Sequence, residues 1–116
     1  YYDDQKAESK RYTEHFLKER APKYLGYCER VIAKSGGPFL TGRKLAYADL
    51  SLFQIVSGLR YAFPAAMKRI EAKVPRSVEV HDRVIARPNI ARYLNSKRRI
   101  AFNEWGIFRH YAELDA

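Results

Sequence analysis

Apolar residues along this chain recur mostly at steps of three or four, the spacing of one face of an α-helix. The first such stretch runs from about residue 10 to residue 35, with Lys, Arg and Glu side chains filling its other face. Pro22 should bend this stretch, because proline removes an amide donor and crowds the carbonyl four residues back. The apolar phase continues across Pro22, so we expect one bent helix that ends at Gly36-Gly37-Pro38.

The stretch from about Tyr47 to Phe63 has a different pattern. Its apolar residues cover most of the circumference, and Asp49 and Arg60 are its only charges. A helix that is apolar nearly all round is buried at the centre of a fold. Gly58 costs this helix about 1 kcal/mol of propensity relative to alanine, so we expect a neighbouring helix to cross closely there.

Shorter helices are predicted at about 65–73, 76–86 and 88–97, and no strand pattern of useful length appears. Residues 100–116 lack clear periodicity but carry four large rings: Phe102, Trp105, Phe108 and Tyr111. Free rings of that size are a solubility liability, so we expect the tail to fold back onto the helices. The chain is predicted to be one all-α domain, with a connecting segment (1–9), a helical bundle (10–99) and a packed tail (100–116).

The start of the buried helix, Leu45-Ala46-Tyr47-Ala48-Asp49-Leu50, reads as half of a capping box. Asp49 falls at the third helical position, where its carboxylate can accept the amide hydrogen of residue 46. Leu45 and Leu50 occupy the two positions of a hydrophobic staple. Ala46 has no side-chain acceptor, which typically costs about 1 kcal/mol. We assign Asp49 an architectural role, because no second acid or base lies at a helical neighbour position.

Composition and cysteine usage exclude several classes of protein. The chain has 116 residues, enough for one core, and its longest nearly uncharged stretch, residues 50–59, is too short to span a membrane. No secretory signal is visible, so we expect a reducing, cytoplasmic setting and no membrane partner. Cys28, the only cysteine, lies on an apolar face and is expected to pack in the core. Neither it nor the widely spaced histidines suggest a metal site.

The net charge of +9 is concentrated in one part of the chain. Residues 65–99 contain ten basic and three acidic residues, a local net charge of +7. This stretch fits an anionic partner and equally fits ordinary solvated helix faces. We do not expect nucleic-acid binding, because few aromatic residues are interleaved with these charges.

Two motifs resemble the all-helical C-terminal domain of cytosolic glutathione transferases. The first is Phe39-Leu40-Thr41-Gly42 followed by Leu45-Ala46-Tyr47-Ala48-Asp49-Leu50, and the second is Arg87-Pro88-Asn89-Ile90 with Tyr93-Leu94. The likeness covers about residues 10–99. Its departure is Ala46, where the family usually has Ser or Thr. The resemblance implies an orthogonal helical bundle, and the segment after the buried helix suggests the sigma-like bacterial and fungal type.

The resemblance also implies a function. Family members bind glutathione, as co-substrate, mainly through an N-terminal thioredoxin-like domain that this chain does not contain, so no catalytic residue is expected here. The hydrophobic electrophile lies between the two domains, and family members usually form homodimers. Carried over to this sequence, the positions that would line the electrophile pocket are Tyr61, Phe63, Phe102, Trp105 and Phe108. Arg11, Arg20 and Arg60 are weaker candidates for meeting the glutathione carboxylates.

The resemblance leaves a second kind of function open. Domains of this family also occur as non-catalytic protein–protein assembly modules, in which case the basic stretch 65–99 would be the docking surface. This sequence does not distinguish conjugation from the reduction of a disulfide or peroxide by glutathione, because the residue that decides between them lies in the other domain.

Overall fold

The computed structural model describes residues 1–116 and is all-helical. Its α-helices are α1 (Lys6–His15), α2 (Ala21–Ser35), α3 (Tyr47–Ala62), α4 (Pro64–Glu71), α5 (Pro75–Ile85) and α6 (Pro88–Leu94). Short 3₁₀ turns, η1 (Tyr2–Asp4) and η3 (Ala112–Leu114), lie near the two ends, and a π-helical turn, η2 (Phe16–Arg20), joins α1 to α2. The only β-type pairing is an isolated bridge between Phe39 and Gly42. The predicted all-α fold class is confirmed.

Helices α1 and α2 form one run that contains a local irregularity just before Pro22. The π turn η2 ends two residues before Pro22, which lies in the first turn of α2. A wider turn at this point accommodates a residue that has no amide hydrogen to donate. The predicted single helix across Pro22 is therefore confirmed, although it begins at Lys6, inside the stretch assigned to the connecting segment. It ends at Gly36, whose φ of 83° is the left-handed C-terminal geometry that glycine favours.

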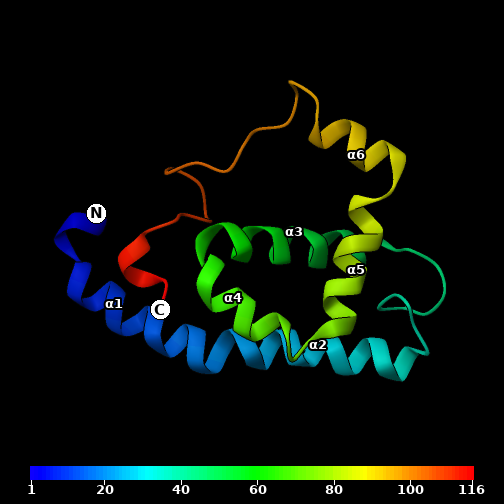
Figure 1. Cartoon of the computed structure of the whole chain (residues 1–116), viewed down its shortest axis with the longest axis horizontal. Coiled ribbons are helices and arrows are strands. Elements are labelled where there is room, and N and C mark those ends of the chain that lie inside the picture. The colour runs from blue at the N-terminus through cyan, green and yellow to red at the C-terminus, as the bar shows by residue number, and fades with distance from the viewer.

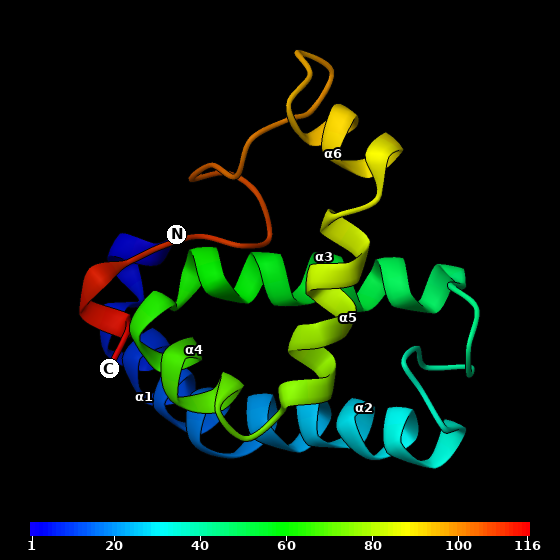
Figure 2. The ribbon, with the colours of Figure 1, turned by 45° about the vertical axis from the view of Figure 1, so that its right-hand side comes forward.

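Helix α3 is the buried central helix that the sequence predicts. Its inward residues join apolar side chains of α2, α4 and α5 in one core cluster, and α5 packs against both α3 and α2. In Figure 1, α2 and α3 run roughly parallel but apart, and α5 crosses between them and packs against both. Figure 2 shows α6 projecting above α3, with the tail returning from it to the end of the molecule where both termini lie.

The close approach predicted at Gly58 exists, but the expected partner was wrong. A Cβ atom built at Gly58 would overlap the ring of Phe108, which belongs to the tail and not to a crossing helix. The Phe108 ring of the tail therefore occupies the space that a side chain at position 58 would fill, and we call this space the notch of α3. Sequence periodicity could not reveal this, because 50 residues separate the two positions and the tail has no helical repeat.

Asp49 has the architectural role that its position predicts. It is fully buried, and its Oδ2 accepts the amide hydrogen of Ala46 at 2.8 Å. Its Oδ1 also accepts the amide hydrogen of Leu40 at 2.9 Å, which ties the preceding loop to the start of α3. Leu45 packs against the core, whereas Leu50 is 36% exposed, and the two side chains border the same shallow surface depression.

Helices α4 and α5 receive their N-terminal carboxylates from distant parts of the chain. The two carboxylate oxygens of Asp115 accept the amide hydrogens of Ala65 and Ala66 at 2.7 and 2.9 Å. In the same way Glu29, on α2, accepts from the amides of Arg76 and Ser77, both at 2.9 Å. Acids at helix N-termini satisfy otherwise unpaired donors and meet the positive end of the dipole. These contacts fasten the tail to α4 and α2 to α5.

No helix of the structure combines the length and the apolar character that crossing a membrane requires. His, Cys, Asp and Glu side chains form no group of three or more with the geometry of a metal site.

Candidate functional site

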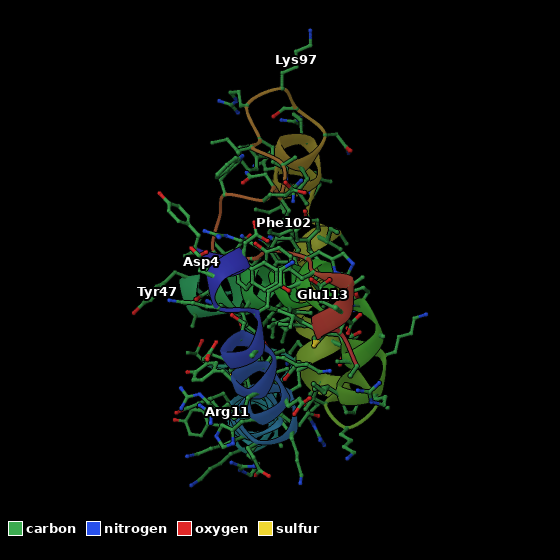
Figure 3. All side chains as sticks on the ribbon, turned by 90° about the vertical axis from the view of Figure 1, so that its left-hand side faces the viewer. Asp4, Arg11, Tyr47, Lys97, Phe102 and Glu113 are labelled. Carbon is green, nitrogen blue, oxygen red and sulfur yellow. The ribbon has the colours of Figure 1, made fainter.

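A groove of about 960 Å³ lies at the end of the molecule where the termini are found. One wall is formed by η1 and α1, the floor by the C-terminal end of α3, and the other wall by the tail. Figure 3 looks onto this end of the molecule, with Asp4 of η1 and Glu113 of η3 above α1. The lining is largely apolar and aromatic, and includes Tyr12, Phe16, Leu59, Phe63, Phe108 and Tyr111. A groove of this size and composition suits a small apolar ligand.

The structure brings four of the five sequence-predicted pocket residues together. Phe63 and Phe108 line the groove directly. Tyr61 and Phe102 stack on each other beside it, with ring centroids 5.0 Å apart and planes 19° apart. Phe102 meets Phe108 edge to face at 6.0 Å, so Tyr61, Phe102 and Phe108 form a connected aromatic set, whereas Phe63 packs against Phe16.

Trp105 is the predicted pocket residue that lies apart from the groove. Its side chain is 86% exposed and does not belong to the groove lining. The sequence pattern signals a large ring in the tail but not the direction in which that ring points. Conversely, the groove residues Tyr12 and Phe16 on the first helix were not among the predicted pocket residues. Their signal is the three- to four-residue spacing of apolar positions in that helix.

The tail wall of the groove is fastened to the N-terminal segment by a tyrosine pair. The rings of Tyr2 and Tyr111 stack with centroids 3.8 Å apart, and the Tyr2 hydroxyl donates to Glu113 Oε1 at 2.5 Å. Donation to a carboxylate stabilises the neutral phenol, so this hydrogen bond raises the pKa of Tyr2 to about 12. The same bond lowers the pKa of Glu113. These groups are exposed, so they link the two ends of the chain at the surface.

Of the three arginines considered for the glutathione carboxylates, only Arg11 lines the groove, where Arg109 and His15 are also found. Arg20 lies over the ring of Tyr24 at 5.3 Å. Arg60 is engaged in an ion pair, its Nε 2.6 Å from Glu71 Oε1. Positive charge at the groove therefore comes from α1 and the tail.

Arg60 belongs to a polar cluster that joins α3, α4 and α5. Its guanidinium lies 3.3 Å from Nδ1 of the buried His81, which also contacts Asp82 and the hydroxyl of Ser57 at 3.0 and 3.2 Å. A Ser–His–Asp series resembles the parts of a nucleophilic site, but here Arg60 packs against the imidazole and none of these residues lines the groove. The cluster stabilises the contact among three helices.

The groove lining is mainly apolar and aromatic, which suits the binding and positioning of an apolar ligand. Cys28 packs against the core cluster as predicted, and burial raises the pKa of its thiol, the opposite of what a reactive cysteine requires.

Fold and site together define an all-helical domain with a buried central helix, whose start is held by Asp49, and an aromatic groove at one end. Residues 1–97 match the family described as "Glutathione S-transferase, C-terminal domain", and the chain belongs to this family. Residues 98–116, which form the tail wall of the groove, lie beyond the matched region.

Curated relatives agree with this family. The chain is 34% identical to "Glutathione S-transferase P 1" of Xenopus laevis over 86 residues. This aligned stretch covers 72% of this chain and 38% of the relative. It is 26% identical over 88 residues to a "Glutathione S-transferase" of Plasmodium yoelii yoelii, covering 75% and 40% of the two chains. A "Glutathione S-transferase" of Plasmodium falciparum is also 26% identical, over 94 residues, 75% of this chain and 42% of the relative. The chain thus spans about two fifths of the length of these relatives.

Proposed function

We propose that this chain is the helical domain of a glutathione transferase and that its groove holds the hydrophobic co-substrate during conjugation of glutathione to an electrophile. The observation that carries the proposal is the aromatic groove itself, which joins the family-matched helices α1 and α3 to the tail. Apolar ring surface holds an electrophile that is itself apolar and excludes water around it.

In this proposal, this chain positions the electrophile and a second domain activates glutathione. Phe16, Phe63 and Phe108 hold the electrophile, which brings its reacting atom within reach of the thiolate of glutathione. Glutathione is bound, and its thiol ionised, mainly by a thioredoxin-like domain of the kind the family has. The chain alone is expected to bind apolar ligands without transferring the thiol.

The remaining features of the proposal follow family resemblance. We propose a homodimer, a cytoplasmic location and a role in detoxification, with no metal requirement. The sigma-like type and the division of the chain into connecting segment, bundle and tail stay predictions. Trp105 stays a predicted contact for the electrophile, one that would require the tail to turn inward from the position described above.

A matched pair of tyrosine variants tests the groove. Tyr12 and Tyr27 lie on the same helical run and are similarly exposed, at 66% and 60%, but only Tyr12 lines the groove. We expect Tyr12→Ser to weaken the binding of the apolar probe 8-anilinonaphthalene-1-sulfonate several-fold, and Tyr27→Ser to leave it unchanged. Equal effects of the two substitutions, or no displacement of the probe by 1-chloro-2,4-dinitrobenzene, would contradict the assignment.

A second experiment separates the enzyme from the assembly module. The protein that carries this domain together with a glutathione-binding domain is applied to immobilised glutathione and assayed with 1-chloro-2,4-dinitrobenzene. Retention with thiol conjugation supports the transferase. Failure of retention, with stable co-purification of another protein that is lost when basic residues in 65–99 are neutralised, supports the module.

A further inference from the structure

The tail presents an apolar tip to solvent that is rigidly built. Trp105 is 86% exposed and Ile107 is 95% exposed. The backbone that carries them is ordered, because the side-chain oxygen of Asn103 accepts the amide hydrogens of Trp105 and Gly106 at 2.8 and 2.9 Å. The Arg109 side chain closes the turn from the other side, donating to the carbonyl of Gly106 at 2.8 Å. This ordered turn therefore holds two large apolar side chains at the surface, and Ile107 also borders the groove.

The stretch of sequence that contains this tip is also rich in basic residues. We call residues 97–109 the basic–apolar segment; it contains Lys97, Arg98, Arg99 and Arg109 against the single acid Glu104. A further apolar residue, Ile100, is 84% exposed at its beginning. Figure 3 shows Lys97 at the extremity of the molecule, well beyond Phe102 and the helical body. The segment therefore exposes Lys97, Ile100 and Trp105 to solvent, whereas its Phe102 and Phe108 rings pack against α3 and the groove.

We propose that the basic–apolar segment is a docking surface for an anionic lipid membrane, which the protein binds peripherally. Tryptophan and aliphatic side chains are favourable at the boundary between headgroups and acyl chains, and flanking Lys and Arg side chains are attracted to anionic headgroups. The finding that no helix could cross a membrane bears only on insertion, and the proposal departs from the sequence-based expectation of no membrane partner.

Other occupants fit the same observations less well. A second copy of this chain would bring like charges of two basic–apolar segments together, which disfavours association. A single-stranded nucleic acid would stack on Trp105, but Ile100 and Ile107 would gain nothing from bases, since aliphatic side chains offer no ring to stack on. Residues 98–109 of the segment also lie beyond the region matched by the family.

Trp105 is the only tryptophan of the chain, so its own fluorescence reports the contact. The full chain is mixed with vesicles of phosphatidylcholine alone, or of phosphatidylcholine with phosphatidylserine, and both co-sedimentation and emission wavelength are measured. We expect co-sedimentation and a blue shift only with the phosphatidylserine vesicles, and weaker binding at high ionic strength, because salt screens the charges.

Charge-matched variants locate the surface. Lys97→Gln with Arg98→Gln should lower partitioning onto the anionic vesicles about 25-fold, about fivefold for each cation removed. The control removes two exposed cations outside the segment, Lys34→Gln in the last turn of α2 with Arg43→Gln in the loop that follows, and should change partitioning less than twofold. Trp105→Ser should weaken sedimentation about tenfold, while far-ultraviolet circular dichroism stays that of the unsubstituted chain.

Three results would overturn the proposal. The first is no sedimentation of the unsubstituted chain with anionic vesicles. The second is an equal loss from the tail pair and the control pair, which would show that only net charge matters. The third is a blue shift of Trp105 that depends on protein concentration or on an added oligonucleotide but not on vesicles, which would assign the segment to a second copy or to nucleic acid.

Discussion

Substituting Gly58 by alanine tests whether the tail is seated in the notch of α3. An alanine Cβ would overlap the Phe108 ring, so the ring must leave its place. Displacing this partly buried ring costs about 2 kcal/mol of packing, and the alanine returns about 1 kcal/mol of helix propensity. We expect Gly58→Ala to lower the free energy of unfolding by about 1 kcal/mol in urea denaturation followed by circular dichroism.

A double-mutant cycle gives this prediction its control. With Phe108→Ala the notch is empty, so Gly58→Ala should stabilise by about 1 kcal/mol, a coupling of about 2 kcal/mol between the two positions. Gly26→Ala on α2, where a Cβ would meet only the Arg30 guanidinium at 3.4 Å, should stabilise in every background. A coupling below about 0.5 kcal/mol, or a Gly58→Ala variant that behaves like Gly26→Ala, would refute the reasoning.

Further predictions concern the carboxylates and the two perturbed side chains. Asp49→Asn should lower the free energy of unfolding by about 2 kcal/mol, because one of two buried amides loses its acceptor; an unchanged urea midpoint would contradict its role. Asp115→Ala should cost about 1 kcal/mol and speed hydrogen exchange of the first amides of α4, whereas unaltered exchange would mean that the tail does not cap that helix. In a spectrophotometric titration one tyrosine, Tyr2, should ionise near pH 12, and Glu113→Gln should return it toward its usual 10.0; nine tyrosines ionising together would count against the pair. Because burial raises the pKa of Cys28, iodoacetamide should modify it slowly near neutral pH and faster after unfolding, and rapid reaction of the native chain would contradict this.

The sequence predicted those features that depend on local spacing. The burial of Asp49 and the position of α3 follow from the apolar pattern and the half capping box, both contained within about 20 residues. The single helical run across Pro22 follows from the apolar phase that continues past this residue. Each of these expectations rests on physics that acts along one stretch of chain, and each is confirmed by the structure.

What the sequence could not provide were contacts between distant segments. Glu29 and Asp115 look like ordinary surface acids, yet each satisfies backbone amides about 50 positions away. The notch at Gly58 was visible as a helix-weakening glycine, but its occupant, Phe108, belongs to a stretch without periodicity. The orientation of Trp105 depends on a turn organised by Asn103, and no residue spacing encodes it.

The remote capping of α4 has a consequence for synthesis of the protein. The amides of Ala65 and Ala66 leave the ribosome about 50 residues before the carboxylate that they bind. At translation rates of about 5–20 residues per second, this helix start waits roughly 3–10 s for its partner. During that interval the tail is also not yet present to cover the apolar floor of the groove. The nascent chain therefore exposes to chaperones an apolar surface that is covered in the folded molecule.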